Sequence, residues 1–155
     1  MQGIEASSLA RWMREAMWAY PAVEAVHILA LGIVVGSIVI VDLRLLGLSR
    51  EISVSRLSRH ALPFTIGAFV VAMFTGILMF TAHAEDFLTN RVFAIKMGLI
   101  LLAGVNAAIL HAGPWRTIAQ WDTGALPPGS VRFQAALSIA FWISVVACGR
   151  LLAYT

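Results

Sequence analysis

Long apolar stretches dominate the chain, and short segments between them hold most of the charged residues. Four stretches, at about residues 22–47, 61–83, 92–111 and 132–153, reach the roughly 20 apolar residues that a helix needs to cross a bilayer. Each is too long for a strand and lacks the alternation of polar and apolar residues that a membrane strand requires. The pattern therefore predicts an all-α integral membrane protein in which residues 22–155 form a four-helix transmembrane bundle.

Residues 1–21, which precede the first span, show a different pattern. Between Ser7 and Tyr20, apolar residues recur at helical spacing, and charged residues occupy the other side of the helix. Ser7 or Ser8 would serve as the N-cap, and Pro21 is expected to end the helix. The segment is predicted to be a short amphipathic helix that lies in the membrane interface.

The composition supports a membrane protein. Of the 155 residues, 60% are hydrophobic and 12% are charged, whereas about 25% of residues are charged in a soluble domain. The formal net charge is only +3, which is too little for a basic nucleic-acid surface, so the expected partner is the lipid bilayer. The single cysteine excludes a disulfide within the chain.

The distribution of basic residues predicts the orientation in the membrane. The segment between the first two spans holds Arg44, Arg50, Arg56 and Arg59, and such segments stay in the cytoplasm. Counted over all loops and both termini, the side of this segment holds six basic residues and the opposite side holds five. The third loop and the termini therefore barely discriminate, and the first loop decides the orientation. We expect a multi-pass protein of the bacterial inner membrane with both termini in the periplasm.

Ionisable residues inside the spans are the candidates for function, because placing them at membrane depth is costly. In the first span, Glu24, His27 and Asp42 share one helix face. In the third span, Lys96 and His111 share a face whose middle positions carry small residues. These two faces are predicted to point into the bundle.

Histidines that face one another from different helices at one depth can hold a haem iron. With the predicted orientation, His27 and His83 lie toward the outer side, and His60 and His111 lie toward the cytoplasmic side. His27 is the preferred iron ligand because it lies within an apolar run, and His83 or His111 is the candidate second ligand. The cofactor would be one haem b, or two if His60 and His111 hold another. Supporting roles fall to the remaining candidates: Glu24, Asp42 and Arg44 beside the ligand, and Lys96 and Arg91 as cations near the propionates.

Several segments carry a resemblance to known families: VEAVH at 23–27, DLRLLG at 42–47, LPF at 62–64, GAF at 67–69, and residues 93–111 with Lys96 and His111. In these segments the chain resembles a bacterial family of small four-span membrane proteins of uncharacterised function. More distantly, it is similar to HemJ-type protoporphyrinogen oxidases and to CopD-like membrane domains. In the HemJ type, a first-span histidine binds haem b and a third-span lysine is essential. The resemblance implies these roles for His27 and Lys96.

Four functions are compatible with these residues. The first is a haem b protein that transfers electrons, and the second is a HemJ-like oxidoreductase that acts on a porphyrinogen or quinol with Lys96 as a catalytic residue. The third is a non-catalytic subunit of a larger redox or transport complex, and the fourth is copper or proton conduction along Glu24, His27 and Asp42. The expected partners, besides lipid, are a quinone or a redox protein, and further copies of the chain or the subunits of a complex.

Overall fold

The structure is a computed structural model, and it describes residues 7–154. Within this range the chain forms helices and no strands, in the order α2 (Ser8–Glu15), α3 (Ala19–Leu45), α4 (Val54–Ala82), α5 (Ala84–Thr89), α6 (Arg91–Ala112), the 3₁₀ helix η1 (Pro114–Gln120) and α7 (Gly129–Leu151). Four of these helices, α3, α4, α6 and α7, are long and apolar enough to cross a membrane. The predicted fold class is confirmed, and the four spans fit a multi-pass membrane protein.

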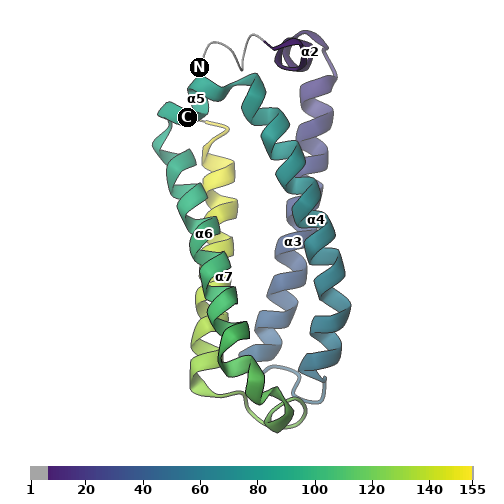
Figure 1. Cartoon of the computed structure of the whole chain (residues 1–155), viewed down its shortest axis with the longest axis vertical. Helices are drawn as coiled ribbons and strands as arrows, with labels where there is room; N and C mark the ends of the chain where they lie inside the picture. The colour runs from purple at the N-terminus through teal and green to yellow at the C-terminus, as the bar shows by residue number, and fades with distance from the viewer. Residues whose placement is uncertain (1–6, 155) are drawn as a thin grey trace.

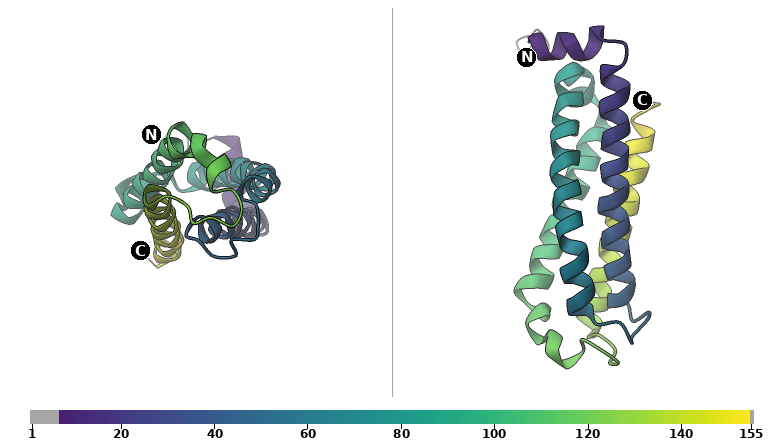
Figure 2. Two further views of the ribbon diagram at one scale, coloured as in Figure 1. Left: turned by 90° about the horizontal axis from the view of Figure 1, so that it is seen from below. Right: turned by 90° about the vertical axis from the view of Figure 1, so that its right-hand side faces the viewer.

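The four long helices run side by side as two antiparallel pairs, α3 with α4 and α6 with α7 (Figure 1). The main contact between the two pairs is the one that α3 makes with α7. The helices α2 and α5 and the end of α7 lie at one end of the bundle. The loop between α3 and α4 lies at the other end together with η1 (Figures 1 and 2).

The side chains are distributed as expected for a protein in lipid. Large apolar side chains point outward, and Leu29, Phe74 and Leu101 are 68%, 62% and 69% exposed. Small residues are common among those buried between the helices, which lets the helix backbones approach closely: Ala30, Ala68, Ala72, Ala103 and Ala135. The apolar exterior is therefore the surface that the bilayer would cover.

The second span begins seven residues earlier than predicted. The Ser53 hydroxyl accepts a hydrogen bond from the main-chain N–H of Arg56 at 3.2 Å, and this N-cap starts α4 at Val54. Arg56 and Arg59, which were expected in the loop, therefore lie on the first two turns of the helix. Both charged residues can be helical because the first two turns of α4 extend beyond the apolar part of the span.

The N-terminal helix is present but shorter than predicted. The Ser7 hydroxyl caps it by accepting from the N–H of Ala10, as expected, but the helix ends at Glu15. Pro21 does not end it, since this residue lies in the first turn of α3, where a proline has no helical hydrogen bond to lose. The helix lies across the end of the bundle (Figure 2), with Met13 fully buried there. Residues 1–6 of the predicted N-terminal segment lie outside the described residues.

Arg44 fastens the loops at the opposite end of the bundle. Its side chain is only 2% exposed, and its Nε donates to the carbonyl of Ile52 at 2.7 Å. Its Nη2 donates to the carbonyls of Asp122 and Arg50, at 3.0 and 3.2 Å. One guanidinium thus joins the loop after α3 to the loop before α7.

The carboxylate of Asp122 makes the return connection to α4. It accepts hydrogen bonds from the Ser55 N–H at 2.7 Å and from the hydroxyls of Ser53 and Ser55, both at 2.8 Å. The main-chain bond to Ser55, followed by the two hydroxyl bonds and the charge of Arg44, holds the pKa of Asp122 below its usual value. We call Arg44, Asp122 and these bonded groups the Arg44–Asp122 latch.

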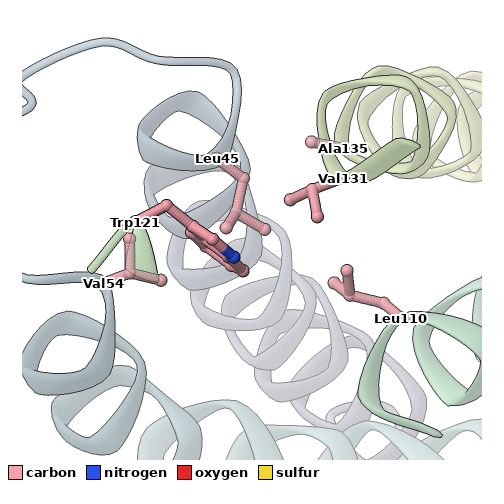
Figure 3. Close-up of a cluster of buried hydrophobic side chains, with 6 residues drawn as sticks. All are labelled: Leu45, Val54, Leu110, Trp121, Val131 and Ala135. Atoms are coloured by element: carbon pink, nitrogen blue, oxygen red, sulfur yellow. The ribbon is translucent and has the colours of Figure 1, made fainter. Parts of the chain in front are cut away.

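A cluster of buried side chains lies at the same end of the bundle and draws on all four long helices (Figure 3). At its centre Trp121 is 3% exposed, and its indole Nε1 donates to the Thr117 hydroxyl at 3.0 Å. The other members are Leu45, Val54, Leu110, Val131 and Ala135. The latch and this cluster together close one end of the bundle.

We expect Asp122→Ala to lower the free energy of unfolding by about 1–2 kcal/mol, the usual cost of a lost helix cap. Because folding lowers the pKa of Asp122, its contribution is complete above about pH 4 and is lost as the pH falls through the folded value. Thermal unfolding in detergent at pH 7 and at pH 3 tests both points. The variant should lose stability mainly at pH 7.

The exposed acid Glu51, at the same end of the bundle, supplies the matched control. Glu51→Ala should leave the unfolding temperature close to that of the natural chain at both pH values. An equal loss in the two variants at pH 7 would contradict a specific role for the latch.

Candidate functional site

His27 lies on α3, and its ring is held by a residue of α4. Its Nδ1 is 2.9 Å from the Oγ1 of Thr75, which is 8% exposed. The Thr75 hydroxyl has one proton, and the carbonyls of Val71 and Ala72 lie within reach of it at 2.8 and 3.1 Å. We therefore assign His27 as the donor through Nδ1–H, and the lone pair of its imidazole then lies on Nε2.

Gly76 explains how the ring of His27 can lie against α4. A Cβ atom at this position would be 3.2 Å from Cε1 and 3.7 Å from Nδ1 of His27. A Cβ at position 76 would therefore contact the ring more tightly than most side chains pack, and the ring would have to shift slightly. Thr75 and Gly76 act together, since one binds the ring and the other makes room for it.

Lys96 reaches the same level of the bundle from the other helix pair. Its Nζ is 3.8 Å from the place that a Cβ of Gly149 would occupy, so the side chain lies between α6 and α7. Its ammonium is close enough to act electrostatically on the ring of His27. We call the set of His27, Thr75, Gly76, Lys96 and Gly149 the His27–Lys96 layer, and it draws on all four long helices.

The other predicted histidines are not brought into this layer. His83 follows α4, eight residues beyond Thr75 and thus about 12 Å farther along the helix axis, and its ring contacts Tyr20 edge-on at 5.2 Å. His111 stacks on Trp115 at 4.8 Å, toward the latch end of the bundle. His60 is exposed, and its ring lies 5.5 Å from that of Phe64. Neither His83 nor His111 is at the depth where it would share an iron with His27.

The charged candidates are also spread over the molecule. Glu24 lies one turn before His27, but the partner of the ring Nδ1 is Thr75. Arg91 is exposed at the first position of α6. Asp42 lies fifteen residues after His27, about 22 Å along α3, and Arg44 belongs to the latch.

Sequence reasoning identified His27 and Lys96 but missed the residues that position them. Thr75 is one of the threonines in the apolar part of the second span, which is a weak signal for a buried partner. Gly149 gave no signal, because glycine in a span usually serves helix packing. Across residues 7–154, no group of three or more His, Cys, Asp or Glu is placed to hold a metal ion.

Comparison with known proteins identifies a family. A family model with the description "Family of unknown function (DUF6644)" matches residues 13–155. The chain belongs to this family. The comparisons with curated proteins and with solved structures found no match for this DUF6644 member. They show no link to the HemJ type or to CopD.

We expect Gly76→Ala to displace the ring of His27 and to weaken its hydrogen bond to Thr75. The added Cβ would approach Cε1 more closely than normal packing allows. The readout is the ¹⁵N NMR spectrum of the imidazole in this DUF6644 chain, in which the Nδ1–H signal should shift or broaden.

Gly67→Ala on the same helix is the matched control, because a Cβ there meets no atom within 4 Å. This variant should keep the imidazole spectrum, and it should gain up to about 1 kcal/mol of stability from the better helix former. An unchanged spectrum in Gly76→Ala would show that the ring is not packed against α4.

Proposed function

We propose that the protein is an integral-membrane haem b protein that transfers electrons, with His27 as an iron ligand. The observation that carries the proposal is the hydrogen bond between Nδ1 of His27 and Thr75 at 2.9 Å. Histidines that ligate metals usually donate their other ring N–H to a neighbouring acceptor, which fixes the tautomer. Inside an apolar span, a neutral imidazole with a free Nε2 suits an iron ligand.

The residues of the His27–Lys96 layer fit the needs of such a group. Haem b supplies one-electron redox chemistry when it is bound. Nε2 of His27 would hold the iron, and Thr75 orients the ring through Nδ1. Lys96 is a cation in the same layer, and Arg91 is a second cation at the start of α6. Either of them would neutralise a propionate through charge-assisted hydrogen bonds.

The arrangement favours one haem with a single histidine ligand. His83 and His111 lie at other depths from His27, so neither completes a bis-histidine pair with it. The rings of His60 and His111 each contact an aromatic side chain a few residues later in the chain, Phe64 and Trp115, respectively. We therefore do not extend the proposal to a second haem.

We further propose that the membrane is the bacterial inner membrane and that both termini face the periplasm. The end of the bundle that carries the latch also carries the basic side chains Arg44, Arg50, Arg56, Arg59 and Arg116. Positively charged ends remain in the cytoplasm. The electron partners would then be a quinone in the bilayer or a redox protein.

Protein purified from a haem-replete host should show a Soret band and the visible bands of haem b. His27→Ala should lose most of this absorbance, because the variant retains no histidine in the layer. His60→Ala is the control and should keep the spectrum, since His60 is exposed outside the layer. A colourless natural chain, or a His27→Ala variant with full absorbance, would refute the proposal.

A second candidate function is an oxidoreductase that acts on a porphyrinogen or a quinol. The observation that favours it is the position of Lys96, whose half-buried side chain brings Nζ to 3.8 Å from the place that a Cβ of Gly149 would occupy. An ammonium next to a redox centre between two helices can stabilise an anion that forms on a substrate. This function would make Lys96 a catalytic residue.

Lys96→Met tests this second candidate, because methionine retains the length and apolar body of lysine without its charge. We expect the variant to keep the haem spectrum and to lose at least tenfold in oxidation of protoporphyrinogen or of a short-chain quinol. Arg91→Met, at the exposed start of the same helix, is the control. If Lys96→Met retains both haem and full turnover, the enzyme assignment is wrong and simple electron transfer remains.

A further inference from the structure

A cavity of about 590 Å³ lies in the half of the bundle nearer the latch, between the two helix pairs. Its volume is within the range of small-molecule sites. Its walls are largely apolar and include the aromatic rings of Phe69, Trp115 and Trp142. Asp42 lines it, about 22 Å along α3 from His27, so it is separate from the His27–Lys96 layer.

Three residues that line this cavity each have a buried side-chain atom with no hydrogen-bond partner within the described part of the chain: Asp42 Oδ2, Ser58 Oγ and Gln134 Oε1. They come from α3, α4 and α7, respectively. Asp42 is only 5% exposed, and Ser138 donates to its carboxylate. Unpartnered polar atoms in a buried site are costly, and their convergence on one cavity points to a ligand that satisfies them.

We infer that the cavity opens to the exterior between α4 and α6, because lining residues on both helices are exposed. These two helices belong to different pairs, and the closest packing of each is with its own partner (Figure 1). On α4, Leu62 and Phe69 line the cavity and are 51% and 43% exposed. On α6, the exposed Gly104 and Ala107 line the opposite edge with little bulk. A molecule dissolved in the bilayer can therefore enter from the side.

The polar atoms select the chemistry of the ligand. Two of the unpartnered atoms are acceptors on different helices: Oδ2 of the Asp42 carboxylate and Oε1 of Gln134. The head group of a matching ligand therefore needs at least two hydrogen-bond donors. The flat rings of Phe69 and Trp142 favour an aromatic head. The apolar opening favours a hydrocarbon tail. An aromatic diol with an alkyl chain, which is the reduced form of a membrane quinone, has all three features.

We propose that the Asp42 cavity binds quinols, with the two hydroxyl groups of the head donating to Asp42 and Gln134. This inference does not depend on the haem proposal, because the site shares no residue with the His27–Lys96 layer. It predicts a preference for the reduced form, since an oxidised quinone accepts hydrogen bonds but donates none.

The test is isothermal titration calorimetry of the full chain in lipid nanodiscs under argon. The probes share a ten-carbon tail: decylbenzoquinol, decylbenzoquinone, decanol and decylamine. We expect the quinol to bind at least tenfold more tightly than the other three. Absence of quinol binding, or equal affinity for the quinone, would refute the proposal. Tighter binding of decanol or decylamine would assign the cavity to a single hydroxyl or to a cation and would equally overturn it.

Asp42→Leu separates a binding role from a structural one. We expect this variant to lose at least tenfold in quinol affinity, while its unfolding temperature without ligand stays the same or rises. A stability gain follows when a buried polar atom without a partner is replaced by an apolar group. A lower unfolding temperature together with full quinol affinity would show that Asp42 serves the fold and not the ligand.

Gly104→Trp tests the site even if Asp42 variants do not fold. A Cβ at Gly104 meets no atom within 4 Å, and a larger side chain there would occupy the opening between α4 and α6. Gly98→Trp on the same helix is the matched control, because Gly98 is equally open but does not line the cavity. We expect only Gly104→Trp to abolish quinol binding. Equal binding by the two variants would contradict the proposed site.

Discussion

The burial of Arg44 constrains the rest of the structure more than any other interaction. A guanidinium that is 2% exposed needs partners for its donors, and the carbonyls that accept from its Nε and Nη2 belong to two different loops. Its Nη1 has no hydrogen-bond partner among the described residues. Asp122 then uses its carboxylate to cap α4. Because the two helix pairs otherwise meet mainly through α3 and α7, this latch keeps the α3–α4 pair in register with the α6–α7 pair.

The division into two pairs also determines how the polar groups are arranged. In the His27–Lys96 layer, His27 and Thr75 belong to one pair, and Lys96 and Gly149 belong to the other. Each half of the layer is therefore held within its own pair. A shift of one pair against the other would change the separation of His27 and Lys96 without breaking the bond between His27 and Thr75. The Asp42 cavity lies closer to the latch, where such a shift is restrained.

The sequence predicted the four spans well, because an apolar run long enough to cross a bilayer has few alternatives as a structure. It predicted the ends of helices less well. The Ser53 cap and the tolerance of the first turn of α3 for Pro21 both depend on local hydrogen bonds that compete with the apolar pattern. Arg56 and Arg59 were assigned to a loop for this reason, although both are helical.

The candidate site was predictable only in part, and for a geometric reason. The cost of burial singled out His27, Lys96 and Asp42 as individual residues. Helical spacing cannot tell how two helices are rotated against each other, so the pairing of His27 with Thr75 was not foreseen. For the same reason, His27, His83 and His111 were grouped, although they lie at different depths. Ser58 and Gln134 are common polar residues, and only the cavity connects them to Asp42.

The latch has a consequence for the order in which the protein is made. The carbonyl of Asp122 that binds Arg44 lies 78 residues later in the chain, and the Asp122 carboxylate that binds Ser53 lies 69 residues later. When the first hairpin emerges from the ribosome, its arginine and its serine caps still lack these partners. The first hairpin can therefore enter the bilayer early, but it reaches its final form only after the third loop has been synthesised. Assembly then ends with the docking of the two hairpins, and the latch forms at the end of the molecule opposite the α5 segment that joins them.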